Sequence, residues 1–185
     1  MGSEAAVREA LAYLTGLTKF GVVPTLERMH VMLPALDNPH TRYPVVHVAG
    51  TNGKGSTARL IAAALQAAGL VTGLFTSPHL VRYNERLMVQ GLPISDEDLL
   101  SLVETAKPLA KRTARRVGHP TEFEMTTVMA FLHFARSQVD VAVMEVGMGG
   151  VWDSTNVVHP LLSVITAIGL DHMDKLGATI AGIAA

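Results

Sequence analysis

One segment of the chain combines the residue types that phosphate binding requires. It runs from Gly50 to Thr57 and lies between a run of apolar β-branched residues and an apolar helical pattern. Glycines let backbone N–H groups approach an anion closely, a helix N-terminus carries partial positive charge, and Lys54 can reach terminal phosphate oxygens. The segment departs from the strict P-loop pattern, because Val48 stands at the place of its first glycine and Gly55 separates Lys54 from Ser56. We predict a phosphate-binding loop that comprises Gly50, Thr51, Asn52, Gly53, Lys54, Gly55, Ser56 and Thr57.

Three further residues suit metal chemistry. Ser77 lies in Thr76–Leu80, where Pro78 ends a strand because it has no N–H and fixes its own φ. Glu145 directly follows an apolar run, and serine and glutamate oxygens are the hard ligands that Mg²⁺ prefers. His172 follows a further apolar run, although magnesium seldom prefers imidazole. Taken singly, each of the three also has an ordinary structural interpretation.

The position of these residues is more informative than their types. The phosphate loop, Ser77, Glu145 and His172 each follow a different expected strand, and open α/β sheets bind ligands at the carboxyl ends of their strands. The strands are nearly all apolar and alternate with helices, which favours an α/β fold with a mostly parallel sheet and helices on both faces. Expected strands are 44–49, 71–76, 139–146 and 161–167, and expected helices are 4–17, 24–36, 56–68, 96–116, 121–138 and one from about 174, with 77–93 irregular.

The overall composition excludes several classes of function. The 185 residues carry 15 basic and 16 acidic side chains, so nothing favours a nucleic-acid or membrane-surface binder. A hydrophobic content of 49% implies a sizeable core. The chain has no cysteine, which excludes disulfides and thiolate metal sites, and no apolar run approaches the ~20 residues of a membrane span. We therefore expect a cytoplasmic location.

The loop after Glu145 holds the candidate substrate contacts. Asp153 and Asn156 suit either turn formation or contact with substrate. Trp152 lies among these polar residues, where it can stack on a flat substrate or simply be exposed. The basic face from Lys107 to Arg116 is interpreted as solvated, with attraction of an anionic substrate as the alternative.

The motifs together resemble those of the folylpolyglutamate synthase/dihydrofolate synthase family within the Mur ligase superfamily. They are Gly50–Thr57, Thr76–Leu80, Glu145–Gly150, Asp153–Asn156 and Gly169–His172, in this order. The resemblance implies a P-loop NTPase-like Mur ligase central domain and an ATP-dependent amide ligase. Such an enzyme activates a carboxylate of a folate or dihydropteroate as an acyl phosphate, which the amine of L-glutamate then attacks.

The resemblance also implies roles for individual residues. Lys54 and the loop amides hold the ATP phosphates, and Lys54 and His172 are the catalytic candidates. Ser77 and Glu145 bind one Mg²⁺, and Glu145 with His172 binds a second. The family positions that line the pterin pocket correspond to Thr121, Phe123, Trp152, Asp153 and Ser154.

The resemblance extends to domain organisation. The family continues beyond this sequence with a metal-site lysine and a C-terminal glutamate-binding domain. We therefore expect residues 1–185 to be a truncated N-terminal ATP-binding domain, with an incomplete fold that ends in an uncapped helix at Ala185 and is inactive alone. The full-length protein is expected to be a monomer whose partners are small-molecule substrates.

Two alternatives remain open. One is a Mur-type cell-wall peptide ligase that acts on a nucleotide-linked sugar peptide. The other is a nucleotide-binding module without ligase chemistry. The amide product formed from each acceptor distinguishes the folate ligase from these two alternatives.

Overall fold

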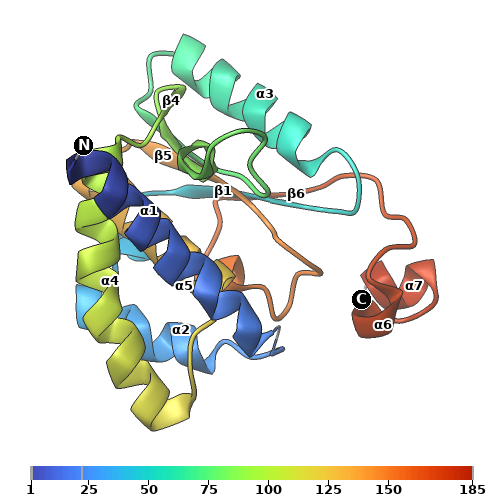
Figure 1. Ribbon diagram of the computed structural model, residues 1–185. Coiled ribbons are helices and arrows are strands. Elements are labelled where there is room, and N and C mark those ends of the chain that lie inside the picture. The colour runs from blue at the N-terminus through green and yellow to red at the C-terminus, as the bar shows by residue number, and fades with distance from the viewer. Residues whose placement is uncertain (1, 22, 185) are drawn as a thin grey trace.

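A six-stranded sheet forms the centre of the protein (Figure 1). The computed structural model describes residues 2–21 and 23–184. The strand order is β4-β3-β2-β5-β1-β6. Strands β2, β5, β1 and β6 are parallel, and β3 pairs antiparallel with both β2 and β4. The strands are β1 (Val45–Ala49), β2 (Thr72–Phe75), β3 (Leu87–Val89), β4 (Leu92–Pro93), β5 (Val141–Glu145) and β6 (Leu162–Ile165). The predicted α/β class with a mostly parallel sheet is confirmed.

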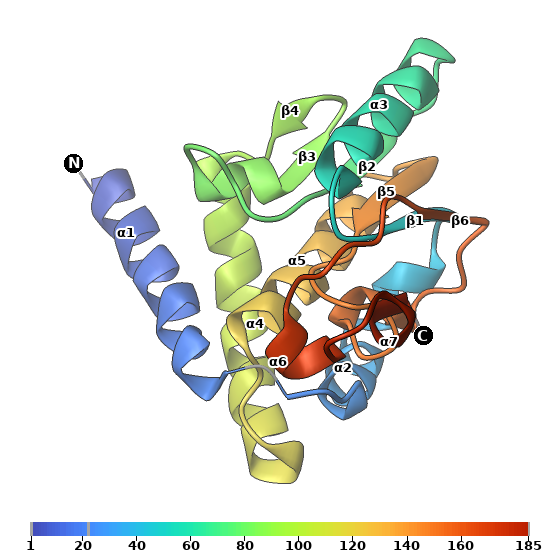
Figure 2. The same ribbon diagram turned by 90° about the vertical axis from the view of Figure 1, so that its right-hand side faces the viewer.

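Helices cover both faces of this sheet, as the two views show (Figures 1 and 2). Helix α3 packs on one face, where Val46 and Val48 of β1 join a small apolar cluster with Ala58 and Ala62. Helix α5 lies on the other face within the larger core, and α1, α2 and α4 pack on the same side. The α-helices are α1 (Gly2–Thr15), α2 (Glu27–Met32), α3 (Lys54–Ala67), α4 (Asp96–Val117), α5 (Glu122–Arg136), α6 (Met173–Leu176) and α7 (Ile180–Ala184).

Capping residues fix where the two longest helices on that side begin. The Ser95 hydroxyl accepts a hydrogen bond from the Asp98 N–H at the start of α4. At α5, Thr121 Oγ1 accepts from the Glu124 N–H at 3.2 Å, while Glu124 Oε2 accepts from the Thr121 N–H at 2.7 Å. This reciprocal capping box satisfies two N–H groups that a helix start leaves unpaired. Arg28 of α2 completes it with a buried ion pair, since Nε lies 2.8 Å from Glu124 Oε2.

The structure corrects three sequence expectations. The stretch 77–93 is not wholly irregular, because β3 and β4 form a hairpin whose turn places Gln90 and Gly91 at positive φ. The expected helix 24–36 is shortened to α2, followed by a 3₁₀ turn at Pro34, which lacks the N–H an α-helix needs. The expected terminal helix is split into α6 and α7, because Gly177 adopts φ +99°. Its expected uncapped end at Ala185 lies outside the described residues. Five 3₁₀ helices are described: Gly16–Phe20, Pro34–Leu36, Pro39–Thr41, Tyr83–Arg86 and Ser154–Val157.

None of the helices in the described part of the chain is both long and apolar enough to cross a membrane.

Candidate active site

The carboxyl edge of the parallel strands gathers the candidate residues. Gly50 follows β1, Ser77 follows β2 and Glu145 ends β5. Because β5 is hydrogen-bonded between β2 and β1, these three positions lie on neighbouring strands. The sequence predicted this common edge, and the strand order shows it.

The phosphate loop is shaped by two glycines. Gly53 is the N-cap of α3 at φ +84°, and no side chain caps the helix there. The N–H groups of Lys54, Gly55 and Ser56, in the first turn, therefore lack both intrahelical partners and a capping side chain. Gly50 adopts φ +133°, and a β-carbon there would lie 2.0 Å from Thr166 Oγ1, so the turn accepts only glycine.

Two other amides of the loop are already engaged. The N–H groups of Thr51 and Asn52 donate to the Ala167 carbonyl at 2.9 and 3.2 Å. Thr51 Oγ1 in addition accepts from the Gly169 N–H at 3.0 Å. The start of the loop is thus fixed to the segment after β6, and the free donors are those at the start of α3.

Lys54 folds back over its own loop. Its Nζ donates to the carbonyls of Gly50 at 2.8 Å and Thr51 at 3.1 Å. The ammonium is therefore held directly above the turn, where it is placed to meet an anion. Ser56 and Thr57 continue into α3.

Glu145 is a buried carboxylate with only 4% of its surface exposed. Its Oε2 accepts a hydrogen bond from the Ser77 N–H at 3.0 Å, and both oxygens lie 3.4 Å from the position of a β-carbon on Gly55. Burial raises the pKa of Glu145, and the Ser77 N–H and the charge of Lys54 oppose that rise. A buried carboxylate beside a serine and a phosphate loop suits a hard divalent cation, which would offset the cost of burying the charge.

His172 lies farther along the edge. It is the N-cap of the short helix α6, and its imidazole is half exposed, with Nε2 3.8 Å from Asp171 Oδ2. The Thr51 contact with Gly169 holds the preceding segment against the phosphate loop. No cluster of three or more His, Asp or Glu side chains in the described ranges is arranged to hold a metal ion. The role of His172 as a metal ligand stays a prediction.

Phe123 reaches the site from the start of α5. A β-carbon at Gly147 would lie 2.5 Å from Phe123 Cζ, so the ring packs directly on the glycine loop after β5. The ring also packs beside Phe75, with centroids 5.8 Å apart. Thr121 is buried, and its hydroxyl serves as the helix cap.

The predicted substrate residues of the 152–154 segment have different environments. Trp152 is 59% exposed and free to stack. Ser154 is buried, and its hydroxyl lies 3.0 Å from Thr127 Oγ1. Asp153 is 6% exposed and accepts four hydrogen bonds from within its own loop, so its observed role is to hold that loop. Burial raises the pKa of Asp153, while these hydrogen bonds lower it.

The motif interpretation overlooked two polar clusters. His47 of β1 is buried with Nε2 2.7 Å from Thr155 Oγ1, and a polar residue within an apolar strand was the available signal. In the second cluster, Glu122 Oε1 accepts from Tyr83 Oη at 2.7 Å and from Arg86 Nη1 at 3.1 Å, and Arg86 Nε donates to His79 Nδ1. No sequence spacing predicts this second cluster, because its members come from separate elements.

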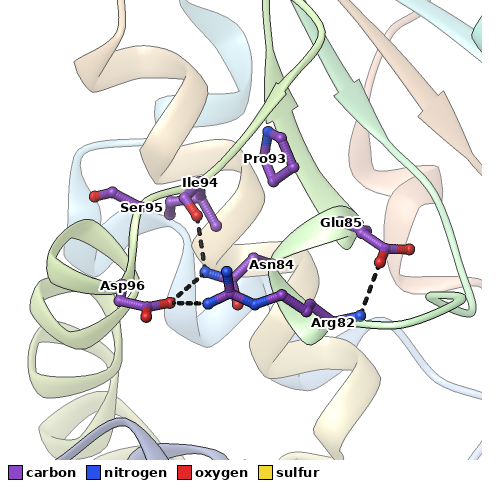
Figure 3. A pocket seen from close by; sticks show the side chains of 7 residues that line it. All are labelled: Arg82, Asn84, Glu85, Pro93, Ile94, Ser95 and Asp96. Atoms are coloured by element: carbon purple, nitrogen blue, oxygen red, sulfur yellow. Dashed lines mark hydrogen bonds and ion pairs between the residues drawn. The ribbon is translucent and has the colours of Figure 1, made fainter. Parts of the chain in front are cut away.

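A surface pocket of about 370 Å³ lies away from the phosphate loop, between the 82–85 and 93–96 segments (Figure 3). Its polar groups satisfy one another. Asn84 Nδ2 donates to the Ile94 carbonyl and to Asp96 Oδ1, and Arg82 Nη2 donates to the same Asp96 oxygen at 2.8 Å (Figure 3). Few donors or acceptors are therefore left in this pocket for a ligand.

The fold and the site define a class. A parallel sheet whose strand β1 leads through a glycine loop into α3, with an acidic residue at the end of the adjacent β5, is the architecture of a P-loop nucleotide-binding domain. The Mur ligase middle domain matches residues 48–185. The chain belongs to the Mur ligase middle-domain family.

Individual relatives agree with this assignment. The dihydrofolate synthase/folylpolyglutamate synthase of Bacillus subtilis is 49% identical over 181 residues, covering 97% of this chain and 42% of the relative. Mycobacterium tuberculosis folylpolyglutamate synthase in complex with ADP has a TM-score of 0.91 at 40% identity, with 98% of this chain and 41% of that chain covered. An FPGS–AMPPCP–folate complex has a TM-score of 0.88 at 42% identity, with 96% and 44% covered. The chain thus spans less than half the length of these relatives.

Proposed function

We propose that this chain is the ATP-binding part of a ligase that joins L-glutamate to a carboxylate of a folate or dihydropteroate. The observation that carries the proposal is the contact between the phosphate loop and the Glu145 carboxylate. The phosphate loop at Gly55 lies against the Glu145 carboxylate, within a chain 49% identical to a dihydrofolate synthase/folylpolyglutamate synthase.

The proposed reaction has two steps. An acceptor carboxylate oxygen attacks the γ-phosphorus of ATP, the bond to the bridging oxygen breaks, and ADP leaves with that electron pair. The amine of L-glutamate then attacks the acyl carbon, inorganic phosphate leaves, and the nitrogen loses a proton as the amide forms. Charge accumulates on the phosphoryl oxygens in the first step, so positioning and electrostatic stabilisation supply most of the catalysis.

The residues of the phosphate loop perform the positioning. The open N–H groups of Lys54, Gly55 and Ser56 are placed to donate to phosphate oxygens. When ATP binds, Lys54 Nζ releases the carbonyls of Gly50 and Thr51 and donates to the terminal phosphate instead. Thr51 keeps the loop fixed to Gly169 during this exchange. Asn52 and Thr57 complete the eight residues assigned to the nucleotide.

Ser77 and Glu145 are the proposed ligands of one Mg²⁺, and Glu145 with His172 those of a second. The oxygen donors and the burial of Glu145 fit this assignment. When bound, magnesium neutralises charge on the phosphates and so favours phosphoryl transfer. His172 is proposed as catalytic together with Lys54.

The acceptor is proposed to lie between the start of α5 and the loop after β5. Phe123 and the exposed Trp152 supply apolar surface for a flat ring, while Thr121, Asp153 and Ser154 shape the surrounding backbone. The glutamate-binding domain is proposed to lie outside these 185 residues, in a monomeric protein of the cytoplasm.

The test is product formation by the whole protein. It is incubated with ATP, L-glutamate and either dihydropteroate, a folate or a nucleotide-linked sugar peptide, and the amide product and ADP are quantified by mass spectrometry. We expect a pterin amide with one ADP for each bond formed. Amide on the sugar peptide alone establishes the cell-wall ligase instead, and ATP binding without any amide product establishes a nucleotide-binding module. Residues 1–185 by themselves are expected to show weak turnover or none.

A further inference from the structure

We propose that His47 is a positioning residue that acts through Thr155 and Asp153 to hold the glycine loop after β5 beside the phosphate loop. The relevance of this role to catalysis rests on the proposed function. The positioning itself does not, and it is tested separately below.

A continuous chain of buried hydrogen bonds carries the proposal. His47 Nε2 lies 2.7 Å from Thr155 Oγ1, which lies 2.5 Å from Asp153 Oδ1. Asp153 Oδ2 then accepts from the N–H groups of Gly147 at 2.9 Å and Met148 at 3.0 Å. The exposed fractions of His47, Thr155 and Asp153 are 7%, 0% and 6%, so water has little access to the chain of contacts.

In this series of hydrogen bonds, each group donates toward Asp153. Four donors converge on the Asp153 carboxylate, which is the pattern that an ionised carboxylate needs because it can only accept. The single hydroxyl proton of Thr155 is therefore donated to Asp153. The Thr155 oxygen is left to accept, so His47 carries its proton on Nε2. Burial lowers the pKa of His47, which favours the neutral ring that this arrangement requires.

The two ends of this hydrogen-bond network, His47 and the N–H groups of Gly147 and Met148, lie close to the two loops of the candidate site. His47 lies three residues before Gly50 on β1, the strand that delivers the phosphate loop. Gly147 and Met148 lie two and three residues after Glu145, and Gly147 is the residue on which Phe123 packs. A side chain of β1 thus adds a buried connection between the strand that leads to the phosphate loop and the loop after β5, beyond the backbone pairing of β1 with β5.

Two substitutions at one position test the proposal on this chain. Thr155→Val removes the hydroxyl at nearly constant volume, whereas Thr155→Ser retains it. Amide hydrogen exchange is measured at Gly147 and Met148, with amides in the centre of α5 reporting on global opening. We expect Thr155→Val to accelerate exchange at Gly147 and Met148 by at least ~10-fold while the α5 amides are unchanged, and Thr155→Ser to restore slow exchange.

A second measurement applies even if Thr155→Val fails to fold. Nitrogen-15 NMR of the His47 imidazole in the unmodified chain at neutral pH reports which ring nitrogen bears the proton. Protonated Nε2 supports the proposal. A proton on Nδ1, or unchanged exchange at Gly147 and Met148 in a folded Thr155→Val protein, overturns it. Neither result depends on whether the protein makes a pterin amide.

Discussion

Gly55 in the first turn of α3 faces the carboxylate of Glu145 at the end of β5, and a β-carbon on Gly55 would lie 3.4 Å from both carboxylate oxygens. This distance is ordinary van der Waals contact, so an added methyl group fits without displacing the backbone. It would, however, cover the carboxylate on the side that faces the phosphate loop. The glycine at this position therefore serves access to Glu145 and is not required by backbone geometry.

Gly55→Ala is expected to separate stability from binding. The helix tolerates alanine at least as well as glycine, so the melting temperature is expected to hold or rise slightly. Affinity for ATP in the presence of Mg²⁺ is expected to fall, because the methyl group shields Glu145. Calorimetry with and without Mg²⁺ measures this, and Gly150→Ala is the matched control because nothing lies within 4 Å of its β-carbon. Equal loss of affinity in both variants contradicts the interpretation.

Lys54→Ala is expected to weaken ATP binding severely. A charge-assisted hydrogen bond contributes about 1.5–3 kcal/mol, which corresponds to a roughly 10- to 150-fold loss of affinity. The variant also loses the two bonds to the Gly50 and Thr51 carbonyls, so its unfolding free energy is measured in parallel. Lys111→Ala on the exposed side of α4 serves as the control. Unchanged affinity in a folded Lys54→Ala protein removes the phosphate-loop assignment.

Glu145→Gln tests the metal assignment. The amide keeps the shape and an acceptor for the Ser77 N–H but removes the charge, so the enhancement of ATP affinity by Mg²⁺ is expected to fall at least ~10-fold. Stability is expected to hold or increase, because burial of an ionised carboxylate is costly, as its raised pKa shows. Titrations of ATP at several Mg²⁺ concentrations measure the effect. Glu104→Gln, on an exposed carboxylate, is the control, and full Mg²⁺ enhancement in Glu145→Gln is the outcome that refutes the role.

The buried ion pair between Arg28 and Glu124 is expected to matter for stability more than for nucleotide binding. Arg28→Met leaves the Glu124 carboxylate buried without its cation, at a cost of about 3–5 kcal/mol in unfolding free energy. The double variant Arg28→Met/Glu124→Gln removes both charges and keeps an acceptor for the Thr121 N–H, so it is expected to recover part of that loss. Denaturant unfolding of the two single variants and the double variant completes the cycle. Additive losses would show that the pair is not coupled.

His133 is expected to make the fold less stable in mild acid. Burial lowers its pKa from 6.5 in the folded state, so the unfolded chain takes up the proton first as the pH falls below about 6.5. The unfolding free energy therefore decreases with falling pH, and His133→Gln is expected to flatten this decrease between about pH 7.5 and 5.5. Denaturant titrations at both pH values measure the slope, with His119→Gln on the exposed loop before α5 as control. A slope that is the same with and without His133 contradicts the prediction.

The sequence by itself determined the parallel α/β class and which residues follow each strand. Apolar runs predicted β1, β2, β5 and β6. The lack of polar alternation matches burial on both faces in β1, β2 and β5, whereas β6, at the edge of the sheet, is largely exposed. Local chemistry likewise determined the glycine turn at Gly50–Gly53. These features depend on residues close together in the chain, so spacing alone reveals them.

Only the tertiary structure decided which side chains meet. Glu145 lies beside Ser77 and Gly55 because β5 is inserted between β2 and β1, an order that no local pattern encodes. For the same reason Asp153, which the sequence allowed as a substrate contact, is enclosed by its own loop and linked through Thr155 to His47, more than 100 residues earlier in the chain. Local spacing specifies the elements, whereas strand order and burial specify which polar groups must satisfy one another, and only the folded chain brings those groups within hydrogen-bonding distance.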